Sequence, residues 1–232
     1  MRDRFNTEIN LLKHRLLNLA NEVCAMIEKT ALALQTLDIK CATEVIQNDA
    51  AIDLEEVEIE EECLKLIALY QPVAADLRLL ITLLKVNGEL ERIADLATDI
   101  AERIFLIAGN EPPEAHKIDF SPILNEAQKM LRDAVKSLVN RNPTLARIVI
   151  LEDDTVDRLD REINALVERI FKKDYRFATY AHHVATISHA VERIADCTTN
   201  ICEDVIYLDN GAIVRHTLRN QLAIAPTPPA ED

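Results

Sequence analysis

The sequence predicts an all-α protein made of two tandem three-helix bundles, and three observations support this fold class. The 232 residues include only 3 glycines and no tryptophan, whereas good helix formers such as leucine, alanine and glutamate are frequent. Apolar residues recur at helical spacing through most of the chain. One helical segment occurs twice, as ERIADLATDIAER at 91–103 and as ERIADCTTNICED at 192–204. This repetition indicates that the chain consists of two related halves.

The first half, residues 1–108, is expected to form one bundle of antiparallel helices joined by tight turns. Its apolar spacing predicts helices at about residues 5–36, 38–70 and 73–108. Pro72 suits the start of the third helix because proline is tolerated in a first helical turn. Gly109 follows this helix as a candidate C-terminal cap.

A proline-containing linker, residues 109–121, is predicted to separate the two halves. The second bundle is expected at 122–212, with Ser121 as the N-cap of its first helix and Pro122 as the first helical residue. Its helices are expected at about residues 122–141, 144–172 and 175–209. The tail, 213–232, is predicted to hold one short helix before a disordered end.

The chain is strongly acidic, with 40 Asp and Glu residues against 26 Lys and Arg residues and a net charge of −14. Direct binding of DNA or RNA is not expected, because neutralising phosphates requires a basic face. The same charge disfavours unaided binding to anionic lipid. It suits cations or a basic protein surface as partners.

Neither secretion nor membrane insertion is expected. The five cysteines form no CxxC pair and their number is odd, which is typical of buried or half-buried thiols in a reducing cytosol. Charged residues follow Met1 at once, so a signal peptide is not predicted. No stretch approaches the roughly 18 apolar residues of a membrane span. The expected location is therefore the cytoplasm.

Carboxylates line one face of the repeated helix. At about 100° per residue, Asp95, Asp99 and Glu102 all lie within about 80° of Glu91 on the helical wheel. Side chains four residues apart approach to about 5–6 Å, so neighbouring carboxylates can hold one cation or bridge two. Without a counter-ion these like charges repel each other and destabilise the helix. The stripe of four carboxylates therefore predicts a bound counter-ion on this face of the helix.

The second copy of the helix differs from the first. It places Glu192, Asp196 and Asn200 on the equivalent face, with His182 and His189 beside them on the wheel. Carboxylate oxygens favour iron, manganese, magnesium or calcium, and imidazole nitrogen would also allow zinc or nickel. The alternative is a solvated acidic face whose charges are balanced by neighbouring arginines.

A weaker repeat lies on the helix that precedes each stripe. DAAIDLEEVEI at 49–59 resembles DDTVDRLDREI at 153–163. Asp53 and Asp157 occupy equivalent positions in these segments, and they are candidate ligands if they reach the stripes across each bundle. Ordinary surface charge is the favoured interpretation of both, since aspartate is mostly exposed.

The chain resembles the PhoU family, the phosphate-uptake regulators of bacteria and archaea. The family motif is Glu-x-x-x-Asp followed by an acid or asparagine four residues on, and it occurs once per half, starting at Glu91 and at Glu192. The segment QPVAADLR at 71–78 is similar to the turn between the second and third helices of that family. The resemblance covers about residues 5–212.

This resemblance implies multinuclear metal clusters, with iron or zinc favoured and manganese, nickel or magnesium as alternatives. The implied ligands are Glu91, Asp95, Asp99, Glu192, Asp196 and Asn200. The resemblance further implies a homodimer that docks to the phosphate ABC transporter ATPase and its sensor histidine kinase and represses the phosphate-starvation response. Direct phosphate sensing is not expected, because no cluster of arginines with glycine amides is evident in the sequence.

Two other classes of function are considered. A di-metal carboxylate enzyme needs Glu-x-x-His on the bundle interior, and none of the 6 histidines has a glutamate three residues before it. A metal-free scaffold would bind a partner helix and leave its acidic stripes solvated. A Gly-rich phosphate loop and a G-x-S-x-G motif are both missing, so a non-enzymatic regulator is expected.

Overall fold

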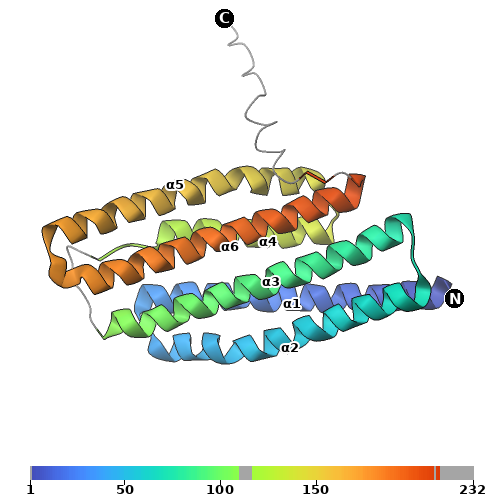
Figure 1. The fold of residues 1–232 in the computed structure, drawn as a ribbon, viewed down its shortest axis with the longest axis horizontal. Helices are drawn as coiled ribbons and strands as arrows, with labels where there is room; N and C mark the ends of the chain where they lie inside the picture. The colour runs from blue at the N-terminus through green and yellow to red at the C-terminus, as the bar shows by residue number, and fades with distance from the viewer. Residues whose placement is uncertain (1, 110–116, 212, 215–232) are drawn as a thin grey trace, which may run out of the picture.

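In the computed structural model, which describes residues 2–109, 117–211 and 213–214, all regular secondary structure is helical (Figure 1). The helices are α1 (Arg2–Thr36), α2 (Ile39–Tyr70), α3 (Ala74–Ala108), α4 (Ser121–Val139), α5 (Pro143–Lys173) and α6 (Ala178–Asn210). A short 3₁₀ helix, η2 (Tyr175–Phe177), precedes α6, where the sequence predicted continuous α-helix. The all-α prediction is confirmed, and most helix bounds agree within two or three residues.

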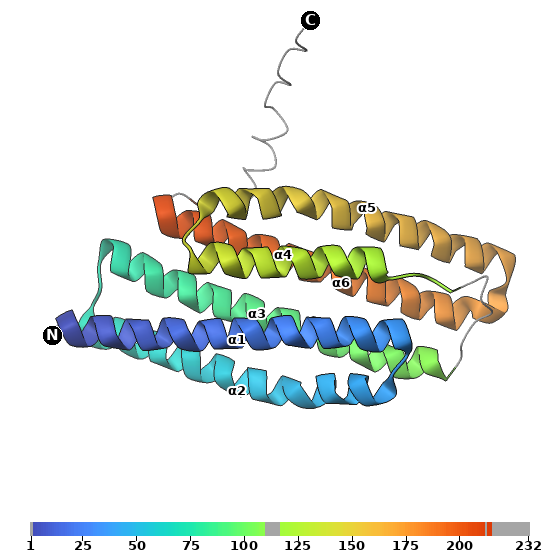
Figure 2. The same cartoon turned by 180° about the vertical axis from the view of Figure 1, so that it is seen from behind.

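The helices lie roughly along one direction in two layers. One layer holds α5, α6, α3 and α2 side by side in that order, and α1 and α4 cover its back (Figures 1 and 2). Within this arrangement α1, α2 and α3 pack on one another as one bundle, and α4, α5 and α6 form the other. The two helices that carry the repeated motif, α3 and α6, contact each other at the centre of the molecule.

The contact between α3 and α6, called here the α3–α6 seam, is antiparallel. The Lys85 ammonium lies 2.7 Å from Asp204 Oδ1, and the Asn200 amide donates to Glu89 Oε1 over 3.2 Å. A step of four residues forward along α3 is thus a step of four residues back along α6. Because α3 and α6 are also copies of one sequence, an approximate twofold axis relates the two halves across this seam.

Burial of its apolar face determines how each motif helix, α3 or α6, is rotated about its own axis. Leu90, Ile93 and Ile100 of α3 have at most 1% of their surface exposed. Each such side chain contributes about 1.5–3 kcal/mol when it is removed from water. Ala94 and its repeat equivalent Ala195 are also buried, and their small side chains allow close helix packing. The carboxylates on the rest of each helix are therefore held at one edge of the core.

Side-chain caps account for where α2 and α5 begin. The Asp38 carboxylate accepts hydrogen bonds from the backbone N–H groups of Lys40 and Cys41. Asn142 does the same for the first turn of α5. Such caps satisfy N–H groups that have no partner within the helix. At its other end, α6 closes on Gly211, whose φ of 74° is a conformation that favours glycine.

The predicted cap of α4 was wrong. Ser121 is the first residue of the helix rather than its N-cap, and Phe120 occupies the cap position without a side-chain hydrogen bond. The reason is Asp119, whose carboxylate accepts from the Ser121 N–H over 2.8 Å. An acceptor two residues upstream holds that N–H, so the helix begins one residue earlier than predicted. Pro122 does lie in the first turn, as expected.

The cysteines and the helix compositions match the sequence analysis. All five cysteines are free thiols, and three of them are buried. Among the described residues, no helix is both long and apolar enough to cross a membrane. The tail helix predicted at 212–223 lies outside the described residues except for 213–214, which are not helical.

Candidate metal centres

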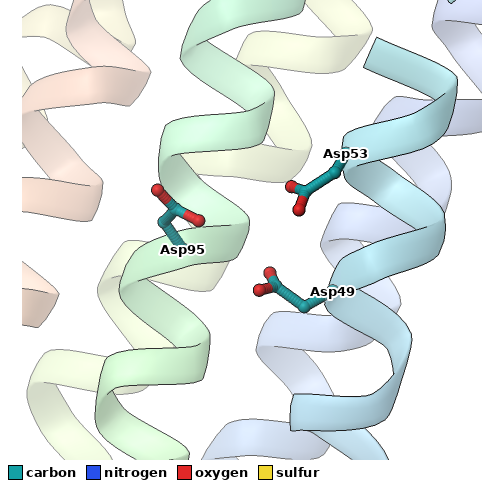
Figure 3. Close-up of side chains that lie close together, drawn as sticks. All are labelled: Asp49, Asp53 and Asp95. Carbon is teal, nitrogen blue, oxygen red and sulfur yellow. The ribbon is translucent and has the colours of Figure 1, made fainter. Parts of the chain in front are cut away.

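Three carboxylates from two helices meet between α2 and α3. Asp49 and Asp53 project from α2 and Asp95 from α3, and one oxygen from each lies within 4.8 Å of the others (Figure 3). We call these residues, together with Glu91 and Asp99 on the adjacent turns of α3, cluster I. Asp49 and Asp53 are one turn apart and therefore share the face of α2 that is turned toward α3.

The carboxyl groups of cluster I make the ionised form of one another less favourable. Partial burial, the neighbouring Asp95 and the acids of α2 all raise the pKa of Glu91. Burial raises the pKa of Asp95 as well, with Asp53 and Asp99 adding to it. Burial followed by the charges of Asp53, Asp95 and Asp99 raises the pKa of Asp49, partly offset by the Thr98 hydroxyl. Such shifts mean that the ionised cluster lacks compensating positive charge.

One oxygen of cluster I is a buried acceptor without a donor. Asp49 Oδ1 is shielded from solvent and makes no hydrogen bond to the described residues, although the Thr98 hydroxyl lies near enough to lower the pKa of Asp49. A buried polar atom without a partner costs about 1–3 kcal/mol. A cation bound between Asp49, Asp53 and Asp95 would remove this cost and the mutual repulsion together. The donor set of cluster I therefore fits a metal ion that prefers oxygen ligands.

The second half contains a corresponding group, called here cluster II, but among the described residues only cluster I brings three ligand atoms within 4.8 Å of one another. Its members are Asp157 and Asp160 of α5 and His189, Glu192 and Asp196 of α6. Burial raises the pKa of Glu192, as do Asp196, Asp157 and Asp160, while His189 opposes the shift. Burial and then Asp157 raise the pKa of Asp196, with His189 and Arg193 acting in the opposite direction. Acids from both α5 and α6 thus act on one another, as those of α2 and α3 do in cluster I.

His189 distinguishes cluster II from cluster I. Its Nδ1 lies 3.1 Å from Glu192 Oε2, one turn along α6. The equivalent residue of the first half is Gly88, which has no side chain to offer. His189 therefore lies beside a motif acid of the second half, and its role as a metal ligand stays a prediction. The other histidine, His182, lies against the ring of its neighbour His183, with ring centroids 5.6 Å apart.

Equivalent polar residues on α3 and α6 orient a further acid in each half. Asn87 donates to the side chain of Glu56 over 3.1 Å and to its backbone carbonyl over 2.8 Å. Ser188, at the same repeat position, donates to Asp160 Oδ1 over 2.6 Å. Both donors are fully buried. The sequence analysis missed them, although a polar residue one turn before each motif glutamate, on the buried face, was the available signal.

The structure adds a neighbour to the weaker repeat. Asp53 is exposed, as the favoured surface interpretation expects, and it also lies beside Asp95 across the bundle. Asp157 likewise lies close enough to Asp196 to raise its pKa. Asp49, which was noted only as part of the repeat, belongs to the same group. Asn200, an implied ligand, donates its amide N–H to Glu89 across the α3–α6 seam, and its role as a ligand stays a prediction.

The chain is thus a duplicated all-α protein built from two tandem three-helix bundles. Each bundle has a group of carboxylates beside its motif helix, which is α3 in the first half and α6 in the second. Comparison with known proteins then identifies the family. The family model of the PhoU domain matches residues 16–104 and, a second time, residues 121–205. The chain belongs to the PhoU family.

Individual relatives match over nearly the whole chain. A phosphate-specific transport system accessory protein PhoU homolog from Aquifex aeolicus is 37% identical over 209 residues, covering 90% of this chain and 94% of the relative. The crystal structure of PhoU from Pseudomonas aeruginosa superposes with a TM-score of 0.86 at 30% identity, covering 90% of this chain and all of that one. The crystal structure of the phosphate transport system regulatory protein PhoU from Streptococcus pneumoniae gives a TM-score of 0.83 at 26% identity over 90% and 99% of the two chains.

Proposed function

We propose that this chain is a non-enzymatic accessory regulator of phosphate transport that holds metal ions in clusters I and II. The meeting of Asp49, Asp53 and Asp95 within 4.8 Å is the observation that carries the metal-binding part. The names of the relatives, an accessory protein and a regulatory protein of phosphate transport, support the regulatory part. We further propose a cytoplasmic location, where the free thiols would stay reduced.

The clusters suit different ions. Cluster I offers only carboxylate oxygens, which favour iron, manganese or magnesium. Cluster II adds the imidazole of His189, which also accommodates zinc or nickel. In each half the bound ion would neutralise acids of two helices and hold those helices together. The ion would thus act structurally, by fixing the shape of the face formed by α5, α6, α3 and α2.

The proposed partners are the ATPase of a phosphate ABC transporter and a sensor histidine kinase, with repression of the phosphate-starvation response as the outcome. The family resemblance supports these partners, and so does the net charge of −14, which suits a basic protein surface. A homodimer is proposed on the same resemblance. Pull-down of the purified transporter ATPase by the tagged full chain tests the first partner, and absence of capture at micromolar concentrations would contradict it.

Metal content tests the central part of the proposal. The Asp53→Asn and Asp95→Asn variants should lose the ion of cluster I and keep that of cluster II, as measured by elemental analysis of protein purified without added metal. Glu61→Gln is the matched control, since Glu61 is an exposed acid on the same helix as Asp53. Unchanged stoichiometry in both aspartate variants would remove these residues from the site. Metal-free wild-type protein would favour the scaffold alternative.

A further inference from the structure

The two ends of the α3–α6 seam are related by the repeat but differ in charge. At one end Lys85 pairs with Asp204, and Asp204 is almost fully buried. At the other end the equivalent positions hold Thr186 and Arg103. The second end of the seam therefore has Arg103 and Thr186 where the first end has an ion pair.

A cavity of about 60 Å³ lies at this second end. Its lining is shared by the two halves and consists of Asp99, Ile100, Arg103, Thr186, Ile187, His189, Ala190 and Arg193. One water needs roughly 10–15 Å³ of such volume, so the cavity has room for a small tetrahedral oxyanion. Arg103 and Arg193 come from different halves and reach the cavity from opposite sides of the seam.

Two nitrogen atoms near this cavity lack acceptors. Arg103 Nε and His183 Nδ1 are both shielded from solvent and have no hydrogen-bond partner among the described residues. The guanidinium also lies close enough to His183 to contribute, after burial and His182, to lowering the pKa of that histidine. Among the residues that line the cavity, Arg103 thus offers one buried guanidinium donor, Nε, that has no acceptor in the described part of the chain.

One lining residue carries negative charge. Asp99 lies one turn before Arg103, and the structure records no ion pair between these two described side chains. In the proposed function Asp99 belongs to cluster I, where its charge would be engaged by the metal ion. Arg103 would then remain without a fixed counter-ion, while Arg193 also lies near Asp196 of cluster II.

We propose that this cavity binds inorganic phosphate, held by Arg103 and Arg193 across the α3–α6 seam. Guanidinium groups match the geometry of phosphate oxygens and form charge-assisted hydrogen bonds to them. The choice of phosphate over other tetrahedral oxyanions rests on the proposed function. A bound anion would join the two halves at the end where the Lys85–Asp204 pair is missing. This proposal departs from the sequence expectation that the chain does not sense phosphate directly.

Isothermal titration of the full-length, metal-loaded protein with inorganic phosphate at fixed ionic strength tests the proposal. Wild type should bind one phosphate per chain at this site, and the Arg103→Gln and Arg193→Gln variants should each weaken it by about tenfold or more. Arg92→Gln is the matched control, because Arg92 occupies the repeat position equivalent to Arg193 but lies outside the cavity. It should bind like wild type.

Three outcomes would overturn the proposal. Phosphate binding that persists in both cavity variants but disappears after chelation would belong to the metal centres. Equal affinity for sulfate would contradict the choice of phosphate. Absence of binding by wild type at millimolar phosphate would exclude the site altogether. Thermal unfolding of each variant verifies that it is folded, and unchanged metal content in the arginine variants separates failure of this site from failure of the proposed function.

Discussion

The Lys85 ammonium lies 2.7 Å from Asp204 Oδ1 and joins the two halves of the chain through α3 and α6. The Asp204 side chain is only 5% exposed, whereas that of Lys85 is 34% exposed. The ammonium also lies 5.4 Å from the centre of the Tyr207 ring, a favourable position for a cation. The pair therefore anchors a buried carboxylate with a cation that still reaches solvent.

Removal of Lys85 should destabilise the protein. Lys85→Met leaves Asp204 buried without its counter-ion, which we expect to lower the free energy of unfolding by about 2–3 kcal/mol. This cost is smaller than that of breaking a fully buried pair, because solvent reaches Lys85. Urea titration followed by circular dichroism measures the change. Lys65→Met is the control, since Lys65 forms an exposed pair with Glu62 and should cost less than about 1 kcal/mol. Recovery in the Lys85→Met/Asp204→Leu double variant would confirm the cause.

Metal-free protein should lose stability as the pH rises through the acidic range. Asp49, Glu91 and Asp95 have pKa values raised above their ordinary 3.8, 4.5 and 3.8. Between the unfolded and folded pKa values the native state binds more protons than the unfolded state, so this contribution is present at lower pH and is lost above the folded pKa values. The Asp95→Asn variant, measured with chelator present, should show a shallower decline. Identical pH slopes in the two proteins would contradict the electrostatic account of cluster I.

The buried donors Asn87 and Ser188 should tune metal affinity without binding metal. Asn87→Ala removes the hydrogen bond that orients Glu56, whose charge acts on Glu91 of cluster I, and Ser188→Ala removes the one that orients Asp160 of cluster II. Loss of such an outer partner typically weakens metal binding by about 10–100-fold. We expect Asn87→Ala to affect only the ion of cluster I and Ser188→Ala only that of cluster II. Competition with a chelator of known affinity measures both, and a crossed effect would refute the assignment.

Alanine substitution should have opposite effects at two glycines. Gly211 has a φ of 74°, which strains any residue with a Cβ, whereas the contact of that Cβ with the Arg78 side chain at 3.7 Å would be an ordinary one. Gly211→Ala should therefore cost about 1–2 kcal/mol. Gly88 lies within α3 and a Cβ there meets nothing within 4 Å, so Gly88→Ala should stabilise by about 0.5–1 kcal/mol. Thermal melts of the two variants should shift in opposite directions.

Local periodicity was sufficient to predict the helices and the stripes. The helical wheel correctly placed Glu91, Asp95 and Asp99 along one face of α3, because that relationship depends only on about 3.6 residues per turn. It could not show which acids of α2 lie opposite, since this depends on how two helices are rotated against each other. The meeting of Asp53 with Asp95 is therefore a result of tertiary packing.

The same limit applies to the α3–α6 seam. The contact between Asn200 and Glu89 and the shared cavity of Arg103 and Arg193 depend on the axial register of two antiparallel helices. Nothing in either helix alone specifies that register. The prediction that Ser121 is the N-cap of α4 was wrong for a different reason. Asp119 and Ser121 are both potential capping acceptors and lie close together in the sequence, so only the backbone conformation determines which of them accepts the hydrogen bond.

The antiparallel pairing of two copies within one polypeptide gives the molecule the geometry of a fused dimer. In a true dimer any substitution would appear in both subunits at once. Here covalent fusion has freed the copies to diverge, so glycine stands at 88 while histidine stands at 189, and a salt bridge closes one end of the seam while a pair of arginines occupies the other. One polypeptide can thereby carry two candidate sites that differ in their side chains although their helices are related by the repeat.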